Sequence, residues 1–273
     1  MKLDITSRVR LNNGIMMPWL GLGVWQMPDR IAEKAVKSAL KTGYRLIDTA
    51  RIYGNEEEVG LAIKESGIKR EDVFVTTKVW NDDHGYEETL RACDHSLRLL
   101  GLRHVDLYLV HWPGGGKREE TWKAMEKILT EEKARAVGVS NYTIGHLEEL
   151  FGYAEVPPAV NQVEFSPYLH QKDLMRYCTD KGIQLEAYSP LTHGRMLGDP
   201  RLLRLGQKYG RSPAQVLIRW CLQSKVVAIP KSAHPERIEE NAQVFDFDIS
   251  EADMKELDGF EKVRTSWDPT NIP

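Results

Sequence analysis

Eight short apolar runs recur along this 273-residue chain, and all but the first end at a polar residue. Each run has the length of a buried strand, and long amphipathic stretches separate one run from the next. Strands that alternate with helices predict an α/β fold with a parallel sheet, and eight of them predict a (β/α)8 TIM barrel. The runs cover residues 19–23, 44–48, 73–78, 105–111, 136–140, 159–162, 183–188 and 226–231.

The stretches between the runs carry helix signals. Residues 56–65 end shortly before Gly67, and residues 86–100 end at Gly101, as expected of helices that stop at a glycine. Asp29 is the expected N-cap of the first helix. We expect helices at 31–40, 56–65, 86–100, 121–129, 144–153, 172–181, 213–223 and 235–244, with an extra carboxyl-terminal helix at 250–259 and an irregular tail after it.

The amino-terminal segment predicts a β-hairpin. Asn13-Gly14 lies between residues 8–12 and 15–18, and this dipeptide is the strongest signal for a two-residue turn. The hairpin precedes the first barrel strand, so we expect it to close the amino-terminal end of the barrel. A barrel needs about 250 residues, so we expect one domain over residues 1–273.

Composition excludes several function classes. The net charge of −3 gives no general attraction to nucleic acid, and no run reaches the about 18 apolar residues of a membrane span. The eight histidines lack metal-site spacing, so we expect no metal. Three scattered cysteines and an amino terminus unlike a signal peptide predict a cytoplasmic protein.

Four polar residues would meet at one rim of the predicted barrel, where the active sites of such barrels lie. Asp48, Lys78 and His111 end three successive strands, and Tyr53 follows Asp48 by five positions. A phenol with a pKa of about 10 is a poor acid at neutral pH, but a nearby ammonium lowers that pKa. Each residue alone is explained as a cap, a surface charge or packing; all four together predict a proton donor.

The motifs around these residues closely resemble those of the aldo-keto reductase family along nearly the whole chain. They are GLGVW at 21–25, GYRLIDTA at 43–50, YGNE at 53–56, KVW at 78–80, DLYLVHWP at 106–113, GVSN at 138–141, NQVE at 161–164, IPKS at 229–232 and RIEEN at 237–241. The resemblance implies a (β/α)8 barrel that reduces carbonyl groups with NAD(P)H. It implies that Tyr53 is the acid, that Lys78 tunes it, that Asp48 pairs with Lys78, and that His111 orients the carbonyl.

The resemblance also implies a cofactor site. Ser140, Asn141 and Gln162 would hold the nicotinamide carboxamide, and Tyr188 would stack on the ring. A guanidinium suits a phosphate, so the family places the adenosine 2′-phosphate at Lys231, Ser232 and Arg237, and we expect NADPH. Further contacts are expected from Gly23, Val24, Asp48, Ser189, Leu191, Glu240 and Asn241.

Tryptophans near the strand ends predict an apolar substrate pocket. Trp25, Trp80 and Trp112 would line it with His111, and Trp267 in the tail would add a lid. Short loops, such as 112–120, resemble the compact microbial branch of the family, which includes reductases of 2,5-diketo-gluconate, methylglyoxal and prostaglandin endoperoxide. We therefore expect small aldehydes and ketones as substrates.

The family is often monomeric, so we expect a monomer. A second class stays open at this point, namely a non-catalytic regulatory protein that binds the cofactor on the same fold. The four intact rim residues and the lack of an amino-terminal extension favour the enzyme.

Overall fold

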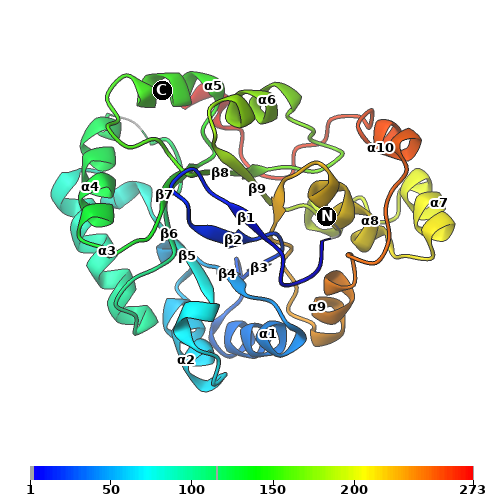
Figure 1. The fold of residues 1–273 in the computed structure, drawn as a ribbon. Helices are drawn as coiled ribbons and strands as arrows, with labels where there is room; N and C mark the ends of the chain where they lie inside the picture. The colour runs from blue at the N-terminus through cyan, green and yellow to red at the C-terminus, as the bar shows by residue number, and fades with distance from the viewer. Residues whose placement is uncertain (1–2, 115, 273) are drawn as a thin grey trace.

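The computed structural model describes residues 3–114 and 116–272, and it contains the predicted barrel. Strands β3 to β10 form one parallel sheet in sequence order, with helices around it (Figure 1). The first and last strands meet, because Leu20 pairs with Ala228 and the Gly21 N–H donates to the Ala228 carbonyl at 2.9 Å. The predicted (β/α)8 fold is confirmed. The predicted short loop at 112–120 includes Gly115, which lies outside the described residues.

Each barrel strand overlaps one of the eight predicted runs. The barrel strands are β3 (Leu22–Gly23), β4 (Leu46–Asp48), β5 (Phe74–Val79), β6 (Leu107–Val110), β7 (Val137–Ser140), β8 (Val160–Glu164), β9 (Gln184–Tyr188) and β10 (Val227–Ala228). The amino-terminal hairpin consists of β1 (Arg8–Arg10) and β2 (Met16–Pro18). Side chains of a strand alternate between its two faces, so residues two apart point to the same side, either into the barrel lumen or toward the helices.

The helices follow the strands, and one of them was not predicted. They are α1 (Asp29–Thr42), α2 (Glu56–Glu65), α3 (Tyr86–Leu100), α4 (Arg118–Thr130), α5 (Ile144–Phe151), α6 (Lys172–Asp180), α7 (Pro200–Tyr209), α8 (Pro213–Gln223), α9 (Pro235–Ala242) and α10 (Glu251–Leu257). Short 3-10 helices are η1 (Arg51–Tyr53), η2 (Arg70–Asp72), η3 (Asn81–Asp83), η4 (Thr192–Gly194) and η5 (Pro269–Asn271).

The structure corrects the predicted N-cap of one helix and adds one helix that was not predicted. Asp29 is the first residue of α1 and Pro28 is the N-cap, so Asp29 contributes its charge to the first turn instead of capping. Helix α7 was missed, although its signals are present in the sequence. Asp199 accepts a hydrogen bond from the Arg201 N–H, Pro200 opens the first turn, and Gly210 ends the helix at φ 62°.

The amino-terminal hairpin closes one end of the barrel, as predicted (Figure 1). Its turn differs from the prediction: residues 12–14 form a three-residue loop in which Gly14 adopts φ 88°. A glycine in this left-handed conformation suits three-residue loops as well as two-residue turns. Leu11 and Met17 of the hairpin are buried against a lumen layer that includes Leu46 and Phe74.

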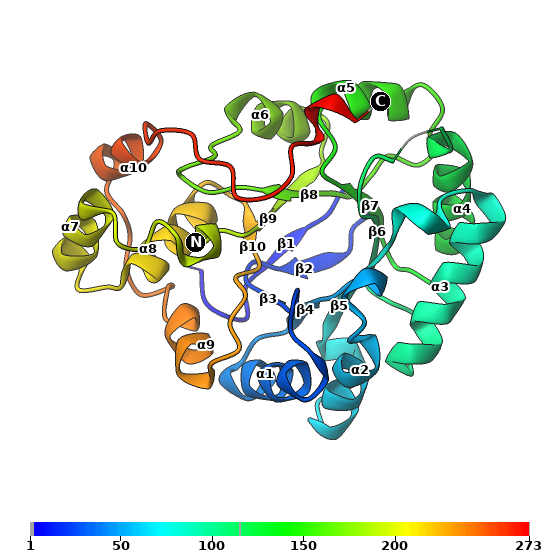
Figure 2. The same cartoon turned by 180° about the vertical axis from the view of Figure 1, so that it is seen from behind.

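The carboxyl-terminal segment, residues 258–272 after α10, crosses the opposite end of the barrel. Figure 2 shows this segment in red, running from α10 past β9 and β8 to α5. The His146 ring nitrogen Nε2 lies 2.9 Å from the Ile272 carbonyl oxygen, which ties the end of the segment to α5. Among the described helices, none combines the length and the apolar character needed to cross a membrane.

Candidate active site

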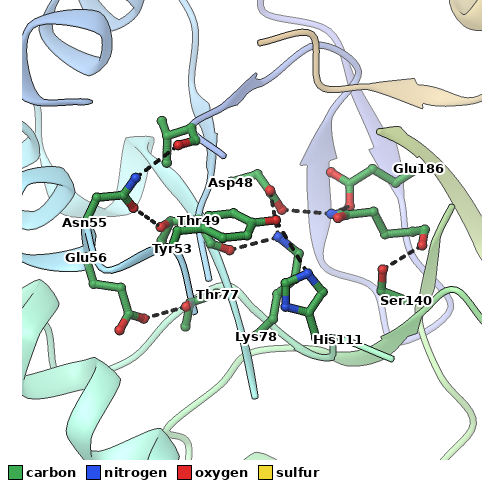
Figure 3. Close-up of polar contacts among 12 residues, drawn as sticks. Asp48, Thr49, Tyr53, Asn55, Glu56, Thr77, Lys78, His111, Ser140 and Glu186 are labelled. Carbon is green, nitrogen blue, oxygen red and sulfur yellow. Dashed lines mark hydrogen bonds and ion pairs between the residues drawn. The ribbon is translucent and has the colours of Figure 1, made fainter. Parts of the chain in front are cut away.

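The four predicted rim residues lie together at the carboxyl ends of β4, β5 and β6 (Figure 3). Lys78 Nζ donates to Asp48 Oδ1 at 2.7 Å and to the Thr49 carbonyl at 2.8 Å. It also lies 5.1 Å from the centre of the Tyr53 ring. The Tyr53 hydroxyl is 3.5 Å from His111 Nε2, at the long limit of a hydrogen bond.

The Lys78–Asp48 ion pair is fully enclosed. The Lys78 side chain has no exposed surface and that of Asp48 is 3% exposed. Removing two charges from water costs several kcal/mol per ion, so such a pair is weak evidence for a stabilising role. Buried charges beside a cleft are more typical of functional sites.

From the sequence we expected Lys78 to lower the pKa of Tyr53. In the structure the pKa of Tyr53 is instead raised well above its ordinary value. Burial is the largest cause, and the carboxylates of Asp48 and Glu186 add to it. Burial, helped by the charge of Lys78, lowers the pKa of His111 well below its usual value. At neutral pH the phenol therefore keeps its proton and the imidazole is uncharged.

A buried amide joins this group to a second carboxyl group. Gln162 Nε2 donates at 2.8 Å both to Asp48 Oδ2 and to Glu186 Oε2. The Ser140 hydroxyl donates to the Gln162 backbone carbonyl at 2.8 Å. Sequence reasoning missed Glu186, although one signal was present: it is a charged residue on the same face of a buried strand as Tyr188.

A cleft of about 1390 Å³ opens over these residues. Small-molecule pockets are typically about 300–1,000 Å³, so this cleft has room for a dinucleotide and a second small molecule. Its lining includes the predicted residues Gly23, Trp25, Asp48, Tyr53, Trp80, His111, Trp112, Ser140, Asn141, Gln162, Tyr188, Ser189, Leu191, Lys231, Ser232, Arg237, Glu240 and Asn241. The side chains of Val24 and Lys78 are buried beneath the described lining.

The polar lining of the cleft includes an amide side chain held in place by its neighbours and two cationic side chains. In the middle, Asn141 adopts φ 65°, and its Nδ2 donates to the His111 carbonyl while Tyr188 donates to its Oδ1 at 2.8 Å. Lys231, shortly before α9, and Arg237, in the first turn of α9, also line the cleft. Cationic side chains and a helix amino terminus together suit an anion.

The carboxyl-terminal segment supplies one wall of the cleft, and a buried glutamate holds it there. Glu164 Oε1 accepts from the Thr265 N–H and hydroxyl, both at 2.6 Å, and Glu164 Oε2 accepts from the Ser266 N–H at 2.9 Å. This places the Trp267 ring 5.7 Å from that of Trp112. Trp267 therefore lines the cleft, and its role as a lid stays a prediction.

Sequence reasoning missed the role of Glu164 and missed His193, which also lines the cleft. The His193 ring lies 5.4 Å from Trp25, in a loop where Ser189, Thr192 and His193 all adopt φ near 50°. A positive φ is uncommon in residues other than glycine, so the sequence gives only a weak signal for this conformation.

Comparisons with known proteins place the chain in a family. The model of the aldo/keto reductase family matches residues 13–262. The chain is 52% identical over 263 residues to glyoxal reductase of Bacillus subtilis (strain 168), covering 96% of this chain and 95% of that one. It is 49% identical over 269 residues to 9,11-endoperoxide prostaglandin H2 reductase of Trypanosoma cruzi (strain CL Brener), covering 97% and 95%.

A solved structure of an aldo-keto reductase enzyme is also similar to this chain. The crystal structure of an aldo-keto reductase enzyme from a Medee basin deep-sea metagenome library superposes with a TM-score of 0.94 at 45% identity, covering 97% of this chain and 99% of that one. The chain therefore belongs to the aldo/keto reductase family. It is an oxidoreductase of a family that reduces small carbonyl compounds and typically uses NAD(P)H. The prediction of an enzyme is confirmed, and the non-catalytic alternative is set aside.

Proposed function

We propose that this protein reduces small aldehydes and ketones with NADPH and uses Tyr53 as the general acid. The observation that carries the proposal is the buried Lys78–Asp48 pair, which lies beside Tyr53 and His111 beneath a cleft large enough for a dinucleotide. The four residues come from one barrel, so we also propose that residues 1–273 act as a single domain and as a monomer.

The cleft residues would hold and orient the nicotinamide. Ser140, Asn141 and Gln162 offer hydroxyl and amide groups for the carboxamide, and Tyr188 offers an aromatic face. Because the Gln162 amide nitrogen faces Asp48 and Glu186, its carbonyl oxygen is turned away from the two carboxyl groups. When bound, the cofactor supplies the hydride that reaches the carbonyl carbon.

The proton comes from the chain itself. Tyr53 keeps its proton at neutral pH and would donate it from the hydroxyl to the carbonyl oxygen. Negative charge that develops on the Tyr53 oxygen is stabilised by the nearby Lys78 ammonium, which Asp48 and the Thr49 carbonyl hold in place. Uncharged His111, in the tautomer protonated at Nε2, would donate a second hydrogen bond to the same oxygen.

Cofactor and substrate choice follow from two groups of residues in the cleft. Lys231, Ser232 and Arg237 suit the 2′-phosphate that distinguishes NADPH from NADH. Trp25, Trp80 and Trp112 supply apolar surface to the lining of the cleft. The relative named glyoxal reductase supports dicarbonyl compounds among the substrates, and the tryptophans favour aromatic aldehydes as well.

Replacing the proposed acid tests this mechanism. Tyr53→Phe removes only the hydroxyl, so kcat for an aldehyde should fall by about 100-fold or more, the usual contribution of a general acid. The Kd for NADPH, measured by quenching of tryptophan fluorescence, should stay unchanged.

Tyr108→Phe is the matched control, because the Tyr108 hydroxyl on β6 is buried and has no hydrogen-bond partner among the described residues. It should keep full turnover. A folded Tyr53→Phe variant with wild-type kcat would remove Tyr53 as the acid.

A further inference from the structure

Glu186 is a fully buried carboxyl group in the lumen of the barrel, and it takes no direct part in the proposed proton donation. It lies on β9, where its register partners are Gln162 on β8 and Val227 on β10. Its Oε2 accepts from Gln162 Nε2 at 2.8 Å (Figure 3). Its Oε1 has no hydrogen-bond partner among the described residues.

The charges around Glu186 are unbalanced. Across the lumen stand Asp48 on β4 and Lys78 on β5, and the ammonium is bonded directly to Asp48. Gln162 and Val227 on the flanking strands are neutral, and His111 after β6 is uncharged at neutral pH. One ammonium thus faces two carboxyl groups, which a single amide joins, and all of these side chains are almost completely buried.

Two carboxyl groups that share such a site do not ionise equally. Asp48 has the ion pair, so the proton belongs on Glu186. Burial, together with the negative charge of Asp48, raises the pKa of Glu186 to about 8. At neutral pH Glu186 is mainly a neutral acid, and it gains its charge as the pH rises through about 8.

We propose that Glu186 is a positioning residue of the reductase site, which orients the Gln162 amide and, by its state of protonation, sets the strength of Tyr53 as an acid. This inference rests on the proposed function. Orientation follows because an amide nitrogen held between Asp48 and Glu186 leaves its oxygen facing the other way. Acid strength follows because a charged Glu186 disfavours the Tyr53 phenolate, so proton donation is easier while Glu186 is neutral.

Two substitutions separate the two effects. Glu186→Gln keeps the size of the side chain and an acceptor for Gln162, but it cannot ionise. We expect the alkaline fall of kcat to move upward by about one pH unit or more relative to wild type. Glu186→Leu also removes the acceptor, so the Kd for NADPH, followed by fluorescence quenching, should rise by about tenfold.

A spectroscopic measurement decides the protonation state without turnover. The infrared difference spectrum between wild type and Glu186→Gln at neutral pH should contain the C=O stretch of a protonated carboxylic acid. That band should disappear from the wild type as the pH rises through about 8. If Glu186→Gln does not fold, the wild-type spectrum alone still tests the proposal, because absence of the band at neutral pH overturns it.

Glu56→Gln is the matched control. Glu56 is a buried carboxyl group on α2 that accepts from the Thr77 hydroxyl, and burial raises its pKa too, but it lies outside the Gln162 bridge. It should leave the alkaline fall of kcat in place. Superimposable alkaline limbs for wild type and Glu186→Gln overturn the proposal. The acid role of Tyr53 is tested separately by Tyr53→Phe, so a failure of the Glu186 proposal can be told apart from a failure of the proposed function.

Discussion

The two ends of the barrel are built from the same strands but have opposite chemistry. Strand β4 begins at Leu46 and ends at Asp48, and β5 runs from Phe74 to a point just past Lys78. These pairs share one face of their strands, since side chains alternate with a period of two. The lower lumen is therefore an apolar layer under the hairpin, and the upper lumen holds a buried ion pair under a cleft.

This difference separates stability from activity within one lumen. The lower layer buries apolar area at no electrostatic cost, which stabilises the fold. The upper layer removes charges from water, which costs free energy and is compensated only by specific partners. Changes at the lower end should therefore alter unfolding, and changes at the rim should alter kinetics or cofactor binding.

The largest expected effect is at the lower end. Phe74 is 2% exposed, so Phe74→Ala should lower the free energy of unfolding by about 3–5 kcal/mol while kcat of the folded enzyme stays unchanged. Urea unfolding and steady-state kinetics measure the two quantities. The control Phe74→Leu keeps the residue apolar and should cost less than about 1.5 kcal/mol. A large fall in kcat without loss of stability would contradict the separation of the two ends.

An intermediate effect is expected at the basic residues that line the cleft. Arg237→Ala removes a charged hydrogen bond worth about 1.5–3 kcal/mol, so NADPH should bind about 10- to 100-fold more weakly while NADH affinity changes little. Fluorescence quenching with both cofactors measures this ratio. Arg204→Ala, which removes a surface arginine paired with Glu256, is the control and should change neither affinity. Equal losses for NADPH and NADH would refute the assignment of the 2′-phosphate.

The smallest effect is expected at the carboxyl-terminal wall. Glu164→Ala releases Thr265 and Ser266, so Trp267 should lose its position over the cleft. A contact worth about 1 kcal/mol corresponds to a roughly fivefold rise in KM for aromatic aldehydes. KM for small dicarbonyl compounds, which would not reach that wall, should stay the same.

Trp267→Ala should reproduce the pattern of Glu164→Ala with less effect on stability. A rise in KM of equal size for aromatic and small substrates in both variants would mean that the tail does not select substrates.

Much of the fold could be predicted from local patterns. Apolar runs located all eight barrel strands, and the predicted bounds of α2 and α8 match the structure. Helix α7 could also have been predicted, because Asp199, Pro200 and Gly210 are ordinary start and stop residues. The hairpin turn could not be settled in the same way, since a glycine suits both loop lengths.

The sequence by itself determined that polar residues would gather at one rim, because strand ends in a parallel barrel share one edge. Only the tertiary structure decided that the Gln162 amide lies between Asp48 and Glu186. It also decided that Thr265 and Ser266 donate hydrogen bonds to Glu164, which is about 100 residues away in the sequence. Such contacts depend on strand register and chain path, which no short segment encodes. The tertiary structure also decided that the pKa of Tyr53 is raised, because this shift sums the effects of burial and of charges on several strands.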